Sequence, residues 1–179
     1  LCYDPQSAAG VTGVLNRYRA LVAAGELKAD PEQEAAAIQL DQLQQQLEAA
    51  PAKSGLFAKL FGGSKAEAPR GLYVWGSVGR GKSMLMDLFH DCLSVEQKRR
   101  AHFHEFMLEV HARLRVERAK EQGDPILPVV DAIADETRVL CFDEMVVNNS
   151  ADAMIMSRLF TGLIEAGVVI VTTSNRAPS

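Results

Sequence analysis

The sequence has little of several features that mark particular classes of protein. Only 6% of its 179 residues are aromatic, and it has three cysteines. No run of eighteen apolar residues occurs, so no transmembrane helix is predicted. The 19 Lys and Arg are outnumbered by 23 Asp and Glu, giving a formal net charge of −4. This balance argues against a nucleic-acid partner held by bulk positive charge, although a local basic patch is still compatible with it.

The cysteines Cys2, Cys92 and Cys141 are widely spaced and form neither a CxxC pair nor a metal-ligand cluster. Reduced thiols in a cytosol-like compartment are therefore expected, which predicts a cytoplasmic protein. The chain starts with leucine and stops at "TTSNRAPS", directly after an apolar run. We expect a longer protein at both ends, and an N-terminal targeting segment stays open.

Three parts are predicted: a helical N-terminal segment at 1–50, a linker at 51–69, and a core at 70–179. In the helical segment, Asp30 is expected to be an N-cap and Pro31 the first helical residue. Apolar residues recur at helical spacing at Leu40, Leu43 and Leu47. The glutamines between these leucines are interpreted as a solvated face.

The linker is rich in Pro, Gly, Ser and Lys. Its segment "LFAKLF" at 56–61 places two leucines and two phenylalanines on one helical face. We interpret it as a short element that packs back on the domain, with peripheral contact to a membrane or a partner as the alternative.

The core alternates short β-prone runs with helical stretches. The predicted strands are 72–75, 102–106, 139–142 and 168–173, and the predicted helices are 82–93, 107–121, 128–136 and 151–166. Continuous apolar strands are typical of a parallel sheet covered by helices on both faces. Ser150 is expected to cap the last helix, with Ile155, Leu159 and Leu163 on its buried side. The fold class predicted is an open, mostly parallel α/β sheet.

Residues 76–83, "GSVGRGKS", fit the phosphate-binding pattern G-x-x-x-x-G-K-[ST] between a strand and a helix. Glycines let the backbone approach a phosphate, and successive N–H groups with the helix N-terminus form an anion site. Lys82 would hold the β- and γ-phosphates, and the Ser83 hydroxyl would bind Mg²⁺. The alternative is a glycine-rich turn with a surface lysine, but the four fixed letters seldom coincide by chance. The predicted nucleotide-binding residues are Gly76, Ser77, Val78, Gly79, Arg80, Gly81, Lys82 and Ser83.

Two acidic residues end the apolar run "RVLCFDE". In open α/β sheets ligands lie at the carboxyl ends of strands, so Asp143 is expected to bind Mg²⁺, directly or through water, together with Ser83. Glu144 would accept a proton from the water that attacks the γ-phosphate, which favours a hydrolase over a kinase. A solvated loop cap is the alternative. Asn175, after the last strand, could reach the γ-phosphate or be a turn residue, and Arg176 is left open between nucleotide and solvent.

The histidines, Cys141 and two arginines of the core are interpreted as structural residues. On the predicted strand 102–106, His102 and His104 would lie on the same face, and we prefer a packed role for them over a metal-binding pair. Cys141 is expected in the core. Arg99 and Arg100 are interpreted as solvated, with a partner's phosphate as the alternative.

Several segments together resemble the ZapE-type, AFG-one-like AAA+ ATPase family: "GLYVWGSVGRGKSMLMDLF", "HFHEFMLEVHARL", "RVLCFDE", "ADAMIMSRLF" and "GVVIVTTSNRAP". The resemblance implies an ASCE-type P-loop fold and ATP hydrolysis in an oligomeric ring. It also implies a role in bacterial cell division or, in mitochondrial relatives with a matrix location, in protein quality control. By the same resemblance, residues 76–83 are Walker A, Asp143 and Glu144 are Walker B, and Asn175 is sensor 1. The catalytic residues would be Glu144, Lys82 and Asn175.

Two departures accompany the resemblance. The run "MVVNNSADAM" stands where the family has a "FQVTDIADAM"-like run, which affects the loop after Walker B. The family continues past residue 179 with an arginine finger and a lid, so weak activity is expected of this chain alone.

The leading hypothesis is an Mg²⁺-dependent ATPase that performs conformational work on a protein partner. The alternatives are a nucleotide-sensing scaffold without useful turnover, a helicase-loader-like module associated with DNA, and a small-molecule kinase. Adenine is favoured over guanine because "SNRA" stands after the last strand in place of an N-K-x-D signal.

Overall fold

The computed structural model describes residues 13–49, 72–75, 81–143 and 145–174. The chain divides into two compact units. The first unit contains residues 13–49 and 81–94, and the second contains the remaining described residues. The predicted linker at 51–69, with its segment 56–61, lies outside the described residues, and the three-part division stays a prediction. Within the described ranges, no helix is long and apolar enough to span a membrane.

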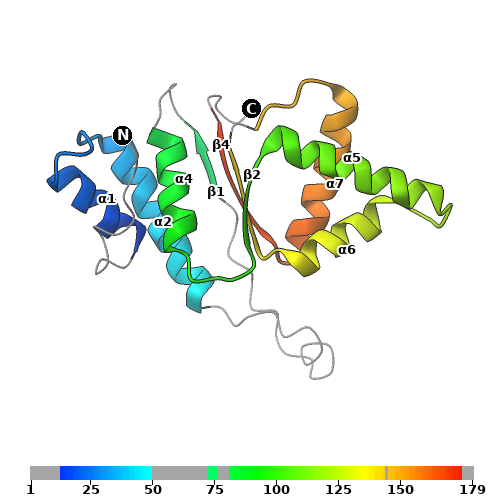
Figure 1. The fold of residues 1–179 in the computed structure, drawn as a ribbon, viewed down its shortest axis with the longest axis horizontal. Helices are drawn as coiled ribbons and strands as arrows, with labels where there is room; N and C mark the ends of the chain where they lie inside the picture. Colours follow the sequence, from blue (N-terminus) through cyan, green and yellow to red (C-terminus); the bar gives the residue numbers. More distant parts are fainter. Residues whose placement is uncertain (1–12, 50–71, 76–80, 144, 175–179) are drawn as a thin grey trace. The chain divides into compact units, whose positions relative to one another are not determined.

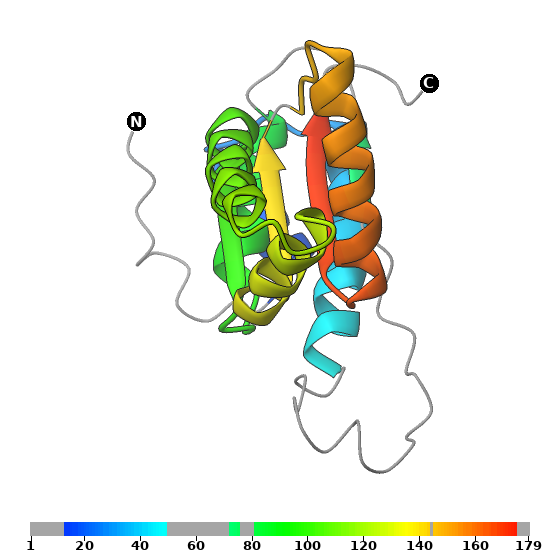
Figure 2. The ribbon, with the colours of Figure 1, turned by 90° about the vertical axis from the view of Figure 1, so that its right-hand side faces the viewer.

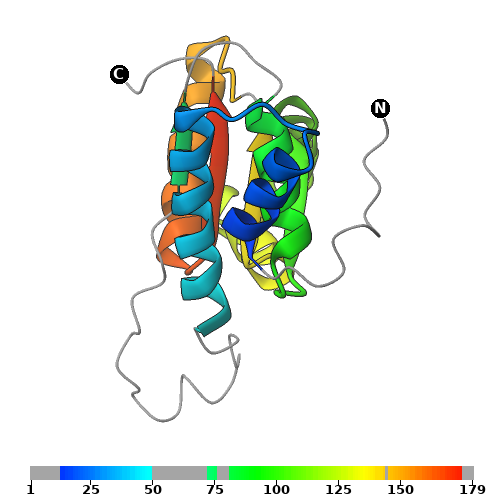
Figure 3. The same cartoon turned by 90° about the vertical axis from the view of Figure 1, so that its left-hand side faces the viewer.

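Three helices form the first unit: α1 (Val14–Ala23), α2 (Pro31–Ala49) and α4 (Gly81–Cys92), and each packs against the other two (Figures 1 and 3). Helix α2 starts as the sequence predicts, with Pro31 as its first residue. The Asp30 Oδ1 accepts hydrogen bonds from the N–H groups of Glu32, at 2.8 Å, and Gln33, at 3.3 Å. These two bonds satisfy donors that the first helical turn leaves without a partner.

The apolar stripe of α2 is also confirmed, because Leu40, Leu43 and Leu47 are buried. The interpretation of the intervening glutamines as solvated is wrong for Gln44, which is 5% exposed. Its Oε1 accepts from the Val14 N–H at 3.2 Å, and its Nε2 donates to the Cys92 carbonyl at 3.0 Å. One side-chain amide thus joins the start of α1 to the end of α4, which explains why a polar residue is buried there.

The second unit is built on a four-stranded sheet: β1 (Leu72–Trp75), β2 (Lys98–His102), β3 (Val139–Asp143) and β4 (Val169–Ser174). The strand order is β1-β4-β3-β2, and every neighbouring pair is parallel. Helices α5 (Phe103–Ala119), α6 (Ile126–Glu136) and α7 (Ser150–Glu165) lie on the same face of this sheet (Figures 1 and 2). The open parallel α/β architecture predicted from the sequence is confirmed.

The core of this unit forms between the sheet and its three helices. The Phe142 ring, on β3, meets Phe103 edge-on at 5.9 Å between centroids. Phe106 lies at 4.7 Å from the same ring, and Phe160 stacks on it at 5.8 Å. Rings from α5 and α7 therefore meet over β3, and such pairs add to the free energy that burial of their area supplies.

The strand predicted at 102–106 is wrong. The strand β2 lies at Lys98–His102, and helix α5 begins at Phe103. The buried residues of α5 are Phe103, Phe106, Met107, Val110 and Leu114. Their spacing is helical, and it outweighs the β propensity of "HFHEF". His102 consequently ends a strand while His104 lies in the first helical turn, so the expected pair on one strand face does not exist.

Arg99 and Arg100 were expected in solvent, and that interpretation is wrong too. Both lie on β2, at the edge of the sheet, with side chains 34% and 22% exposed. Arg99 forms two hydrogen bonds with the Glu109 carboxylate of α5, and its guanidinium lies 5.7 Å from the centre of the Phe106 ring. Charged residues suit an edge strand, because they oppose pairing with another chain.

The Glu109 carboxylate also accepts from Arg113 Nε at 3.1 Å. The hydrogen bonds from Arg99 lower the pKa of Glu109 below its ordinary value, against a smaller effect of burial that raises it. Since the folded chain favours the ionised form, this carboxylate stabilises the fold above its unfolded pKa of about 4.3. The contribution is lost as the pH falls through the lower folded value.

Glu109→Gln is expected to lower the free energy of unfolding by about 1 kcal/mol near pH 7. The difference from wild type should narrow as the pH falls below the unfolded pKa of about 4.3 and close once the pH has passed the lower pKa of the folded Glu109 carboxyl. Urea unfolding at a series of pH values from 7 downward measures this. The control is Glu105→Gln, an exposed position on the same helix. A difference for Glu109→Gln that does not depend on pH would contradict the assignment.

The cap of α7 is one residue earlier than expected. Asn149, not Ser150, is the N-cap, and its Oδ1 accepts from the Asp152 N–H at 2.7 Å. Ser150 is the first helical residue. The buried side of α7 is formed by Met156, Leu159 and Leu163, and Ile155 packs partly buried against the core.

Asn149→Ala should therefore lower the free energy of unfolding by about 1 kcal/mol, through loss of this cap. Ser150→Ala is the matched control and should change it by a few tenths at most. Thermal or urea unfolding of the two variants distinguishes the positions. An equal or larger effect at Ser150 would show that the hydroxyl is the cap.

Candidate nucleotide-binding site

The last three residues of the phosphate-binding motif open a helix, as the motif requires. Helix α4 begins at Gly81, so Lys82 and Ser83 lie in its first turn. There the backbone N–H groups lack partners within the helix and carry the positive end of its dipole. The rest of the motif, at 76–80, lies outside the described residues.

Gly81 lies against the side chain of Gln33, on α2, a contact that the sequence pattern does not reveal. A Cβ atom on Gly81 would be 2.3 Å from Nε2 and 2.9 Å from Cδ of Gln33. Both distances are too short for any side chain unless Gln33 moves. A larger residue at this position would displace the amide at the flexible end of the Gln33 side chain.

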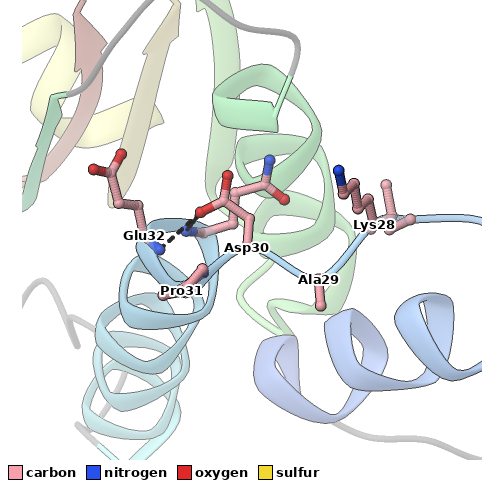
Figure 4. A pocket seen from close by; sticks show the side chains of 7 residues that line it. Lys28, Ala29, Asp30, Pro31 and Glu32 are labelled. Carbon is pink, nitrogen blue, oxygen red and sulfur yellow. Dashed lines mark hydrogen bonds between the residues drawn. The ribbon is translucent and has the colours of Figure 1, made fainter.

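A cavity of about 820 Å³ lies next to this contact, on the connection between α1 and α2 (Figure 4). It is lined by Leu27, Lys28, Ala29, Asp30, Pro31, Glu32 and Gln33. Asp30 and Glu32 stand at the start of α2, joined by the capping hydrogen bond drawn in Figure 4. The cavity has the size of a small-molecule site.

In the second unit, β3 ends at Asp143, whose side chain is 11% exposed. Arg100 Nη2, on the neighbouring strand β2, donates to Asp143 Oδ2 at 2.6 Å. Past β3, the Met145 N–H donates to the Thr173 carbonyl of β4 at 3.3 Å. The chain thus stays beside β4 where the parallel strands end. Glu144, Asn175 and Arg176 lie outside the described residues.

Sequence reasoning missed Arg100 as a partner of Asp143. Its contact depends on the register of β2 against β3, where Arg100 is opposite Cys141 and His102 is opposite Asp143. The helical spacing of the buried residues of α5 was the available signal, because it moves the strand back to 98–102. With that strand in place, a cation next to Asp143 could have been expected.

Cys141 is buried in β3, and burial raises the pKa of its thiol to about 12. The thiol stays protonated at physiological pH and does not act as a nucleophile. The described residues hold no group of three His, Cys, Asp or Glu side chains that could bind a metal ion. Ser83 and Asp143 belong to different units, and their joint Mg²⁺ site stays a prediction.

A model of the AFG1-like ATPase family matches residues 12–179. The chain belongs to this family. Cell division protein ZapE of Escherichia coli K12 is 47% identical over 135 residues, which cover 72% of this chain and 36% of ZapE. Lactation elevated protein 1 homolog B of Danio rerio is 47% identical over 124 residues, 64% of this chain and 25% of that protein. The matched part thus spans about a quarter to a third of these relatives.

Solved structures agree on the fold of this AFG1-like chain. The match to the crystal structure of DnaI includes 98% of this chain and 77% of the DnaI chain, with a TM-score of 0.55 at 15% identity. The match to AMPPCP-bound DnaA from Aquifex aeolicus includes 84% of this chain and 40% of the DnaA chain, with a TM-score of 0.56 at 12% identity. These likenesses show the P-loop AAA+ fold.

Gly81→Ala tests the contact between α4 and α2. The new methyl group should lower the free energy of unfolding by about 1 kcal/mol, because it forces the Gln33 amide to move. In a Gln33→Ala background the same change should instead raise it by up to about 1 kcal/mol, since alanine favours a helix over glycine. A double-mutant cycle by chemical denaturation measures the coupling. Additive effects of the two substitutions would contradict the contact.

Proposed function

We propose that this AFG1-like chain binds ATP with Mg²⁺ and that the intact protein hydrolyses the ATP to perform conformational work on a protein partner. The main support is the Gly81-Lys82-Ser83 run at the start of α4 in a member of an ATPase family. An Asp at the carboxyl end of a buried parallel strand adds to it.

The residue types suit this chemistry. Lys82 offers a positive charge to the β- and γ-phosphates, beside the helix N-terminus. The Ser83 hydroxyl and the Asp143 carboxylate are the hard oxygen ligands that Mg²⁺ takes. When bound, the ion would neutralise charge on the phosphate oxygens. Arg100 orients the Asp143 carboxylate through the 2.6 Å hydrogen bond.

Two residues of the proposal rest on sequence alone. Glu144 accepts the proton of the attacking water, and Asn175 positions that water against the γ-phosphate. Both follow directly on a described strand end, Glu144 on β3 and Asn175 on β4. Because the strands are parallel, these ends lie at the same edge of the sheet.

The biological setting is proposed from the relatives. The name of ZapE supports a role in cell division, and a quality-control role is the alternative for a eukaryotic protein. We further propose a cytoplasmic homo-oligomer with a protein client and a peripheral membrane contact through 56–61. The likeness to DnaA and DnaI is at 12% and 15% identity, so it carries no DNA-binding role.

The proposal is tested by ATP binding to this chain and phosphate release by the intact protein. Lys82→Ala should abolish ATP binding, whereas Lys120→Ala, at an exposed position, should not. Glu144→Gln should keep ATP binding and lower turnover by about 10²- to 10⁴-fold.

Unchanged ATP binding in Lys82→Ala would remove the phosphate site. Unchanged turnover in Glu144→Gln would remove the assigned base. Tight ATP binding without turnover in the intact wild-type protein would instead identify a nucleotide-sensing scaffold.

A further inference from the structure

The edge strand β2 carries two adjacent arginines whose side chains lie on opposite faces of the sheet. Successive side chains of a strand alternate between its faces. Arg99 bonds to Glu109 of α5, so it lies on the face that the helices cover. Arg100 therefore lies on the other face, together with Asp143, which follows the core residue Phe142 on β3. Two neighbouring cations of one strand thus pair with carboxylates in two different places.

The contact between Arg100 and Asp143 depends on the register of the strands. In the parallel pair of β2 and β3, Arg100 is opposite Cys141, two positions before Asp143. A long side chain spans this distance, and Arg100 Nη2 donates to Asp143 Oδ2 at 2.6 Å. The two side chains are 22% and 11% exposed, so water screens the pair only in part.

The same carboxylate is the proposed ligand of Mg²⁺, and Arg100 affects that role through its charge. An arginine guanidinium is always charged in proteins. It repels a divalent cation next to Asp143, and this repulsion is strong where water is partly excluded. The phosphates of a nucleotide bring negative charge that offsets the repulsion. Protein sites for Mg²⁺ commonly combine one or two carboxylates with substrate phosphates.

We propose that Arg100 weakens Mg²⁺ binding at Asp143, so that the ion enters the site together with the nucleotide, an inference that rests on the proposed function. Without nucleotide, Arg100 is the counter-ion of the carboxylate. With nucleotide, the negative charge of the phosphates outweighs that of the guanidinium. Orientation of the carboxylate by the same hydrogen bond favours the ion, but one such bond contributes less than repulsion between a unit charge and a divalent cation. Arg100 thereby disfavours the form of the protein that holds metal but no nucleotide.

The test is Mn²⁺ binding to the intact protein without nucleotide, measured by electron paramagnetic resonance of the free ion. Arg100→Met removes the charge at similar length and should tighten Mn²⁺ binding about ten- to a hundredfold. Arg100→Gln should also tighten it, while it keeps an N–H donor for Asp143. The matched control is Arg99→Met, which removes the same charge from the adjacent residue on the other face. It should change the Mn²⁺ affinity by less than about twofold.

Two further variants show where the effect arises. Asp143→Asn in the Arg100→Met background should abolish the gain in affinity, because the gain comes from this carboxylate. Arg100→Lys should bind Mn²⁺ as weakly as the wild type, because it keeps the positive charge. Circular dichroism and urea unfolding verify that each variant folds.

Binding of a non-hydrolysable ATP analogue, measured in parallel, separates this inference from the proposed function. If the wild type does not bind the analogue, both fail. If the wild type binds it and neither neutral substitution at Arg100 tightens Mn²⁺ binding, the ATP site stands and the role of Arg100 fails. Weaker Mn²⁺ binding in both neutral variants would show that Arg100 acts by orientation alone, which also overturns the inference.

Discussion

Burial of strand β3 is the constraint on which the second unit depends. Its residues 139–142 are fully buried, and it pairs on both sides, with β2 and with β4. The strand then ends in Asp143, a charge at the border of an apolar core. Such a charge is costly unless it is paired. Arg100, on the neighbouring strand β2, is the partner of this carboxylate. The edge strand therefore pairs with β3 and also stabilises the charge at its end.

This constraint explains which parts of the fold the sequence could predict. The strands β3 and β4 were predicted to within about a residue, because a strand buried on both faces must be an apolar run. The strand β2 carries the polar run 98–100 and was missed. These residues form a strand because they pair with β3, about forty positions away in the sequence. The β propensity of the local sequence does not reveal such long-range pairing. The error then placed the start of α5 four residues late.

In the candidate site, too, local features could be predicted from the sequence and long-range contacts could not. The motif at 81–83 was predicted to open a helix and does, since its chemistry and its local structure coincide. The contacts that the sequence did not reveal are between residues far apart in the chain: Gln33 against Gly81, and Arg100 on Asp143. The α7 cap was misplaced for another reason. Adjacent Asn149 and Ser150 are both good caps, and only backbone geometry decides between them.

The N-terminal helices are more than a segment that precedes the nucleotide-binding core. Gln44 holds the first residue of α1 and the last carbonyl of α4 with one amide, and Gln33 meets α4 at its other end. Helix α4 is therefore fixed by α1 and α2 at both of its ends. Any ligand that binds only the folded form stabilises it by RT ln(1 + L/Kd), where L is the free ligand concentration and Kd its dissociation constant. A nucleotide on α4 would therefore stabilise the packing of all three helices, and a change in that packing would alter nucleotide affinity by the same free energy.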